Sequence, residues 1–142
     1  MELALEVANR AAKRGEIPVG AVLVHCGKLL VQTGNRVETD QDPTAHAEIL
    51  AIRAAAQMLS TKRLIDCDLY VTLEPCTMCA ASISFARIRH LYFGAYDLKG
   101  GGVENGIRFF GQPTCHHVPE VFGGIHEAKC GEILKNFFLL RR

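Results

Sequence analysis

The stretch DLYVTLEPCTMCAASISFA, residues 68–86, decides the fold of this chain. Its first part, residues 68–73, is rich in β-forming side chains, and Pro75 opens an apolar helical run over residues 76–86. A strand that leads directly into a helix is a building unit of layered α/β domains. The stretch also holds two cysteines, Cys76 and Cys79, with two residues between them. Such a pair can hold a metal, carry out redox exchange or form a plain disulfide.

The segments around this stretch alternate between helical and strand patterns. Before it, the periodicity predicts a helix over 2–14, strands over 19–25 and 28–35, a loop over 36–42, and a helix over 43–59 with Asp42 as N-cap. After it, the sequence predicts a strand over 90–95, a long Gly-rich loop over 96–117, a short strand over 118–124 and a helix over 125–140. We therefore expect a single α/β domain, residues 1–142, around a mixed sheet.

Composition narrows the class of protein. The 142 residues are 49% hydrophobic, and charges interrupt every apolar run before it reaches the length of a membrane span. No signal peptide is visible, so we expect a cytoplasmic protein whose six cysteines stay reduced. The net charge of +1 neither favours nor excludes a nucleic-acid partner.

Two short motifs together predict a metal centre. His46 and Glu48 form a His-x-Glu motif near a predicted helix start, and Cys76 and Cys79 open the other helix. One imidazole and two thiolates are the ligand count of a catalytic zinc site, which keeps its fourth position for water. Zinc acidifies this water, and the hydroxide is then the nucleophile. Glu48 is placed to take a proton from the water and return it to a leaving amine.

Other interpretations of these residues stay open. Cys76 and Cys79 could form a thioredoxin-like redox pair, a disulfide or part of a structural zinc site, although a redox pair has no use for His46 and Glu48. Glu74 is expected to fix the turn before the second helix and to have no catalytic role. The remaining histidines and cysteines are expected to be core or surface side chains; they include His25, Cys26, Cys67, Cys115 and Cys130.

The chain resembles the bacterial tRNA adenosine deaminases, which belong to the cytidine deaminase-like superfamily. The resemblance runs through GEIPVGAVLV, GNR, DPTAHAEILAIRAA, LYVTLEPCTMCAASI, FGAYDLKGG and FFLLRR. It implies a three-layer α/β/α sandwich with a mixed, about five-stranded sheet, one Zn2+ per chain and a homodimer. The implied reaction is hydrolytic deamination of adenosine to inosine at the wobble position of a tRNA anticodon, with ammonia leaving.

The resemblance also implies roles for single residues. His46, Cys76 and Cys79 are the expected zinc ligands, and Glu48 is the expected proton shuttle. The backbone around Pro75 is expected to help hold the water and the base. The expected contacts to the anticodon stem-loop come from Asn35, Asp97, Phe138, Arg141 and Arg142, with Phe137 beside them.

A deaminase of free bases or nucleosides, such as guanine or cytosine, is the nearest alternative, since it would use the same zinc core. Asn35 and the basic, aromatic C-terminus favour the tRNA substrate, because a free-base enzyme needs neither.

Overall fold

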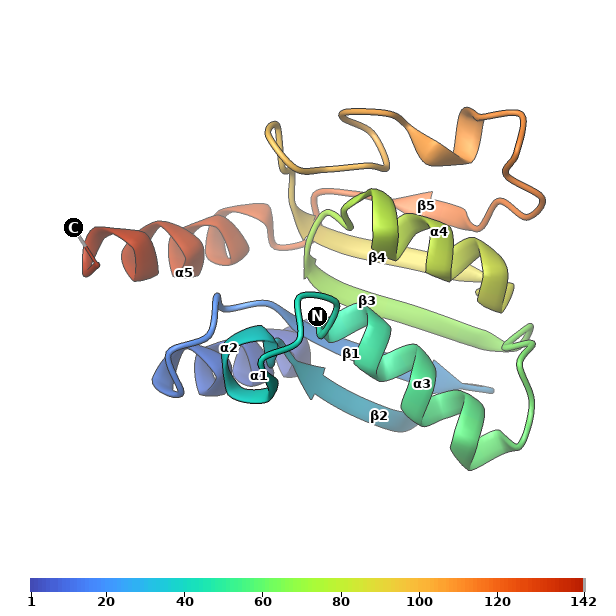
Figure 1. Ribbon diagram of the computed structural model, residues 1–142, viewed down its shortest axis with the longest axis horizontal. Helices are drawn as coiled ribbons and strands as arrows, with labels where there is room; N and C mark the ends of the chain where they lie inside the picture. The colour runs from blue at the N-terminus through green and yellow to red at the C-terminus, as the bar shows by residue number, and fades with distance from the viewer. Residues whose placement is uncertain (142) are drawn as a thin grey trace.

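The computed structural model describes residues 1–141 and is built on a five-stranded mixed sheet with the order β2-β1-β3-β4-β5 (Figure 1). The strands are β1 (Gly20–His25), β2 (Lys28–Gly34), β3 (Cys67–Leu73), β4 (His90–Ala95) and β5 (Glu120–Phe122). β1 runs antiparallel to both β2 and β3, whereas β3, β4 and β5 run parallel. The predicted mixed sheet is confirmed.

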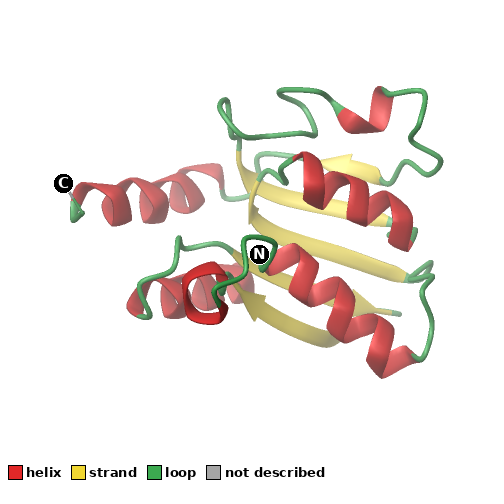
Figure 2. Cartoon of the chain, viewed as in Figure 1, coloured by secondary structure: helices red, strands yellow, loops and turns green. Residues whose placement is uncertain are grey.

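Helices cover both faces of the sheet and make three layers (Figure 2). The helices are α1 (Glu2–Lys13), α2 (Val37–Asp40), α3 (Ala47–Leu59), α4 (Thr77–Ala86) and α5 (Glu127–Leu139), with a 3-10 turn η1 (Phe109–Gly111). α3 and α4 lie side by side on one face, and α1 and α5 contact the other. Within residues 1–141, no helix combines the length and the hydrophobicity that crossing a membrane requires.

The main core lies between the sheet and the pair α3 and α4. Strand side chains alternate between the two faces, and those facing this pair are fully buried: Leu23, Leu69, Val71, Leu91 and Phe93. Small buried residues four apart, Ala47, Ala51 and Ala55, lie along one side of α3. Small side chains at this spacing let α3 pack closely on the sheet, which brings its first turn beside the strand ends.

Three segments differ from the sequence prediction. The helix predicted from residue 43 begins at Ala47, because the carboxylate of Asp42 binds the backbone N–H of Thr44 at 2.8 Å and so forms a turn rather than a helix cap. The predicted loop 36–42 contains the short helix α2, whose Thr39 N–H donates to the buried carboxylate of Glu16 at 2.7 Å. The last strand is shorter than predicted and covers only Glu120–Phe122.

Candidate active site

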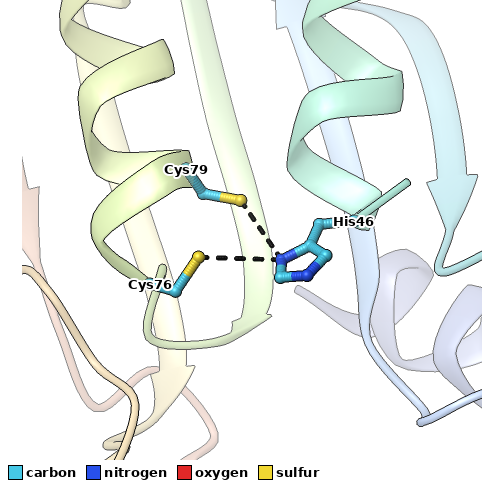
Figure 3. A group of neighbouring side chains, drawn as sticks. All are labelled: His46, Cys76 and Cys79. Atoms are coloured by element: carbon cyan, nitrogen blue, oxygen red, sulfur yellow. Dashed lines mark hydrogen bonds between the residues drawn. The ribbon is translucent and has the colours of Figure 1, made fainter. Parts of the chain in front are cut away.

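His46, Cys76 and Cys79 meet at the starts of α3 and α4 (Figure 3). His46 is the N-cap residue of α3 and Cys76 is the N-cap residue of α4, and both have extended backbones. The Nδ1 atom of His46 lies 3.7 Å from Cys76 Sγ and 3.6 Å from Cys79 Sγ. Residues separated by thirty or more positions are thus brought together because two helices begin next to each other.

The separations between these atoms fit a tetrahedral zinc site. With usual Zn–S and Zn–N bond lengths, tetrahedral geometry places a sulfur and a nitrogen ligand about 3.6 Å apart. The observed distances of 3.6 and 3.7 Å match that value, and the three ligand atoms all lie within 4.8 Å of one another. The His and Cys side chains are therefore positioned to hold a metal ion, as the sequence predicts.

The two thiols differ strongly in acidity. A hydrogen bond with Cys79, supported by His46, lowers the pKa of the Cys76 thiol to about 4. The same contact, together with burial, raises the pKa of the Cys79 thiol far above its usual range. Zinc binds cysteine as the thiolate, so binding of a divalent metal would release thiol protons.

Glu48 lies in the first turn of α3, and its side chain is only 4% exposed. Burial is the main cause that raises the pKa of this carboxyl, and His46 opposes the shift. A carboxyl whose pKa is raised toward neutrality is suited to accept a proton and to return it. Glu48 lines a cavity of about 810 Å³ together with His46 and Cys76, so a molecule in this cavity would reach all three side chains.

Asn35 also lines the cavity and is held by α3. Its Oδ1 atom accepts a hydrogen bond from the backbone N–H of Ala47 at 2.9 Å, which satisfies one of the free amides at the start of this helix. This bond fixes the orientation of the side-chain amide and leaves its nitrogen able to donate to a ligand. The structure thus brings Asn35 to the same site as His46 and Glu48.

Glu74 has a larger part than the sequence predicts. Its buried carboxylate accepts backbone hydrogen bonds from Asp97, Val103, Glu104 and Asn105, and one from the Asn105 side chain. The same segment returns to the start of α4, where the N–H of Gly102 donates to the carbonyl of Pro75 at 2.8 Å. Glu74 therefore ties the segment 97–105 to the residues directly before Cys76.

The end of α5 and the residues after it form one side of the cavity. Phe137, Phe138 and Arg141 line it, and the Arg141 guanidinium lies 4.0 Å from the centre of the Phe137 ring. Phe137 is almost buried, whereas Phe138 is 51% exposed and free to contact a ligand. Arg142, also expected to contact RNA, lies outside the described residues.

Comparison with known proteins identifies the family. Residues 1–95 match the sequence profile of the cytidine and deoxycytidylate deaminase zinc-binding region. The tRNA-specific adenosine deaminase of Agrobacterium fabrum (strain C58 / ATCC 33970) is 58% identical over 142 residues, which are 100% of this chain and 93% of that protein. This chain belongs to the tRNA-specific adenosine deaminase family. The Aquifex aeolicus (strain VF5) member is 44% identical over 139 residues, covering 97% of this chain and 91% of that relative.

Solved structures agree with this family and its fold. A structure from studies of A-to-I editing by tRNA:A34 deaminases at the wobble position of transfer RNA superimposes with a TM-score of 0.93. It is 60% identical and covers 94% of this chain and 97% of that chain. A guanine deaminase from Nitrosomonas europaea reaches a TM-score of 0.82 at 21% identity, covering 96% of this chain and 81% of its own; it shares the fold. The predicted resemblance to the tRNA adenosine deaminase family is confirmed.

In this deaminase family member, the structure gathers most of the predicted site residues around one cavity. Asn35, Asp97, Phe138 and Arg141 line it together with His46, Cys76 and Glu48. Pro75 is not among the residues that line the cavity in the described chain, and its carbonyl is occupied by Gly102. The predicted role of Pro75 in holding water or base therefore stays a prediction, as do the individual RNA contacts.

Proposed function

We propose that this chain is a zinc-dependent hydrolase that deaminates adenosine to inosine at the wobble position of a tRNA anticodon. The observation that carries the proposal is the buried carboxyl of Glu48 beside a His–Cys–Cys ligand set, at the base of a large cavity. Membership in the tRNA-specific adenosine deaminase family supports the choice of substrate. The wobble base in an anticodon loop is accessible, because single-stranded loops present unstacked bases.

We assign His46, Cys76 and Cys79 as the zinc ligands. A zinc ion bound there supplies an acidified water as the nucleophile. Two thiolates and one neutral imidazole offset the charge of the ion and complete a three-ligand set typical of catalytic zinc sites. The lowered pKa of the Cys76 thiol favours metal binding, because the thiolate is the form that binds zinc.

Glu48 is the proton carrier in this proposal. Its carboxylate accepts a proton from the attacking water and delivers it to the amine nitrogen of adenine, which leaves as ammonia. The burial that raises the pKa of Glu48 makes this carboxylate a better proton acceptor than an exposed one. The side chain of Glu48 is only 4% exposed, so little solvent reaches this carboxyl.

The remaining cavity residues hold the RNA. We assign the amide nitrogen of Asn35 to the flipped nucleoside, and the exposed ring of Phe138 to stacking with a neighbouring base. Arg141 supplies a positive charge for the phosphate backbone, and Asp97 shapes the loop at the cavity mouth through its bond to the Gly100 N–H at 2.9 Å. A cavity of about 810 Å³ has room for a nucleoside with adjoining groups.

A homodimer and a cytoplasmic location complete the proposal. Phe85 on α4 is 72% exposed and Met58 on α3 is 60% exposed, and a second chain packed on these helices would cover both. Light scattering on the purified protein tests this arrangement, and a monomer at micromolar concentration would contradict it. A cytoplasmic location would place the protein with its tRNA substrate.

The function is tested by a substrate panel. Zinc-loaded protein is incubated with a tRNA that carries adenosine at the wobble position, with its anticodon stem-loop, and with free guanine, cytosine and adenosine. The proposal predicts inosine at the wobble position of both RNAs and no turnover of the free compounds. Turnover of free guanine or cytosine without inosine in RNA would favour the free-base deaminase.

A further inference from the structure

A second group of metal-binding side chains lies at the other end of the sheet. His25 ends β1, Cys26 begins the hairpin turn that follows, and Asp66 directly precedes β3. One ligand atom from each of these residues lies within 4.8 Å of those of the other two. β1 has six residues and spans about 20 Å, so this group is well separated from the residues at the start of α4.

The backbone holds these three residues in place. The N–H of Cys26 donates to the carbonyl of Asp66 at 3.1 Å, and His25 pairs with Cys67 in the antiparallel ladder of β1 and β3. Two segments that are forty residues apart are thereby fixed side by side. The side chains of His25 and Cys26 are also close, since Nε2 lies 3.5 Å from Sγ. This separation equals, within 0.1 Å, the about 3.6 Å expected for nitrogen and sulfur ligands on one tetrahedral zinc ion.

The cysteine is not required by the turn. Cys26 and Gly27 both have positive φ values, 49° and 78°, as in the two-residue turns that favour Asn, Asp or Gly at these positions. A cysteine side chain there is strained relative to those residues, is exposed to solvent and lies next to a histidine. The deaminase reaction uses neither side chain.

The surroundings allow a cation to enter. Cys26 and Asp66 are exposed, His25 is half-buried, and a shallow cavity of about 220 Å³ opens beside His25 and Asp66. Two basic side chains oppose a cation there: Arg63 lines the cavity, and Arg89 interacts electrostatically with Asp66 and Cys26. A thiolate and a carboxylate together carry two negative charges, which offset a divalent ion.

We propose that His25, Cys26 and Asp66 form a second, solvent-exposed Zn2+ site, independent of the deaminase reaction. A thiolate, an imidazole and a carboxylate are ligands that zinc accepts, whereas magnesium and calcium prefer oxygen alone. The Cys26 thiol releases its proton to solvent when the metal binds, and water completes the coordination.

Zinc stoichiometry tests this site directly. The full chain is dialysed against micromolar zinc and then against buffer with a weak chelator, and its zinc content is measured. The proposal predicts two zinc ions per chain in the unsubstituted protein and one in Cys26→Ser or His25→Ala. The control Cys115→Ser, which changes a thiol that is not part of this group, keeps two. One zinc in the unsubstituted protein, or a second zinc that persists in both variants, would overturn the proposal.

A second measurement does not depend on the stoichiometry. Alkylation of Cys26 by iodoacetamide is followed by peptide mass spectrometry, with and without micromolar zinc, and alkylation of Cys115 is followed in the same samples. Zinc is expected to slow the reaction of Cys26, because a metal-bound thiolate is no longer a free nucleophile, and His25→Ala is expected to remove this protection. Equal alkylation rates of Cys26 with and without zinc would refute the site. Cys26→Ser retains full deaminase activity if the two sites are independent, so failure here is distinguishable from failure of the proposed function.

Discussion

The side-chain amide of Asn105 donates a hydrogen bond to the carboxylate of Glu74 at 2.7 Å, and four backbone N–H groups donate to the same carboxylate. One buried acid thus organises the segment 97–105 next to the start of α4. The hydrogen bonds outweigh burial, and they lower the pKa of Glu74 so that it stays charged.

Replacing Glu74 with Gln tests this relationship. The new amide group presents N–H donors to backbone N–H donors, so we expect a loss of about 2 to 3 kcal/mol in the free energy of unfolding. Because the loop is displaced, kcat/KM for tRNA should fall as well. Urea unfolding of the zinc-loaded proteins measures the first effect. Glu104→Gln, an exposed acid in the same segment, serves as the control and should change neither quantity.

The role of Glu48 is tested by Glu48→Gln. The amide keeps the shape of the side chain but cannot carry the proton, so we expect turnover to fall by about 10² to 10⁴-fold. Zinc content should stay at the unsubstituted level, because Glu48 is not a proposed ligand. Inosine formation and metal analysis on the same sample give both values, with the exposed Glu6→Gln as control. Unchanged turnover would remove Glu48 from the mechanism.

Phe138 gives a prediction about RNA binding. Its ring is 51% exposed at the cavity, and loss of one base stack should raise KM for the tRNA by about tenfold with little effect on kcat. Steady-state kinetics of Phe138→Ala with the anticodon stem-loop measures both constants. Leu140→Ala, an exposed apolar residue on the same helix end, should leave them unchanged. An equal KM for Phe138→Ala and Leu140→Ala would contradict stacking between Phe138 and a base.

Asp68 gives a prediction about pH. Burial opposes ionisation of this carboxyl, but hydrogen bonds from Arg89 and His90 outweigh it and lower the pKa of Asp68. A lowered folded-state pKa means that the stabilisation is complete above the unfolded value of about 3.9 and is lost as the pH falls through the folded value. Asp68→Asn should therefore be about 1 kcal/mol less stable at pH 7, since the partner Arg89 is partly exposed.

The measurement compares urea unfolding of Asp68→Asn with that of the unsubstituted protein at pH 7 and below pH 4. Zinc release in acid affects both proteins, so the difference between their free energies of unfolding reports the contribution of Asp68. The difference should shrink in acid, and Glu132→Gln, on the exposed side of α5, should show none at either pH. A constant difference over this pH range would contradict the ion pair.

Much of the fold and the metal site is predictable from sequence. The metal site is predictable because His46, and the pair Cys76 and Cys79, belong to short motifs. Each motif lies at the start of a helix, which the local sequence pattern predicts. The predicted helix start near residue 43 is wrong for a local reason. Asp42 and Pro43 are residues typical of a helix start, but the Asp42 carboxylate accepts hydrogen bonds from Thr44 and forms a turn. An Asp side chain can form either a helix cap or a turn, and the two differ too little in free energy for a sequence pattern to decide between them.

The contacts of Glu74 and Cys26 could not be predicted. Glu74 binds donors 23 to 31 residues away in a segment without periodicity. Cys26 meets Asp66 only because β1 and β3 pair in one particular register, which the sequence does not specify in advance. Long-range pairing therefore determines both features.

The most direct test of the account is inosine formation at the wobble position. Zinc-loaded protein is mixed with an anticodon stem-loop that carries adenosine there, and with the same RNA carrying the adenosine at the next position. We expect inosine in the first RNA, none in the second, and formation about 10² to 10⁴-fold slower in the first RNA with Glu48→Gln. Absence of inosine from the first RNA, with zinc bound and free guanine turned over, would contradict the proposed function.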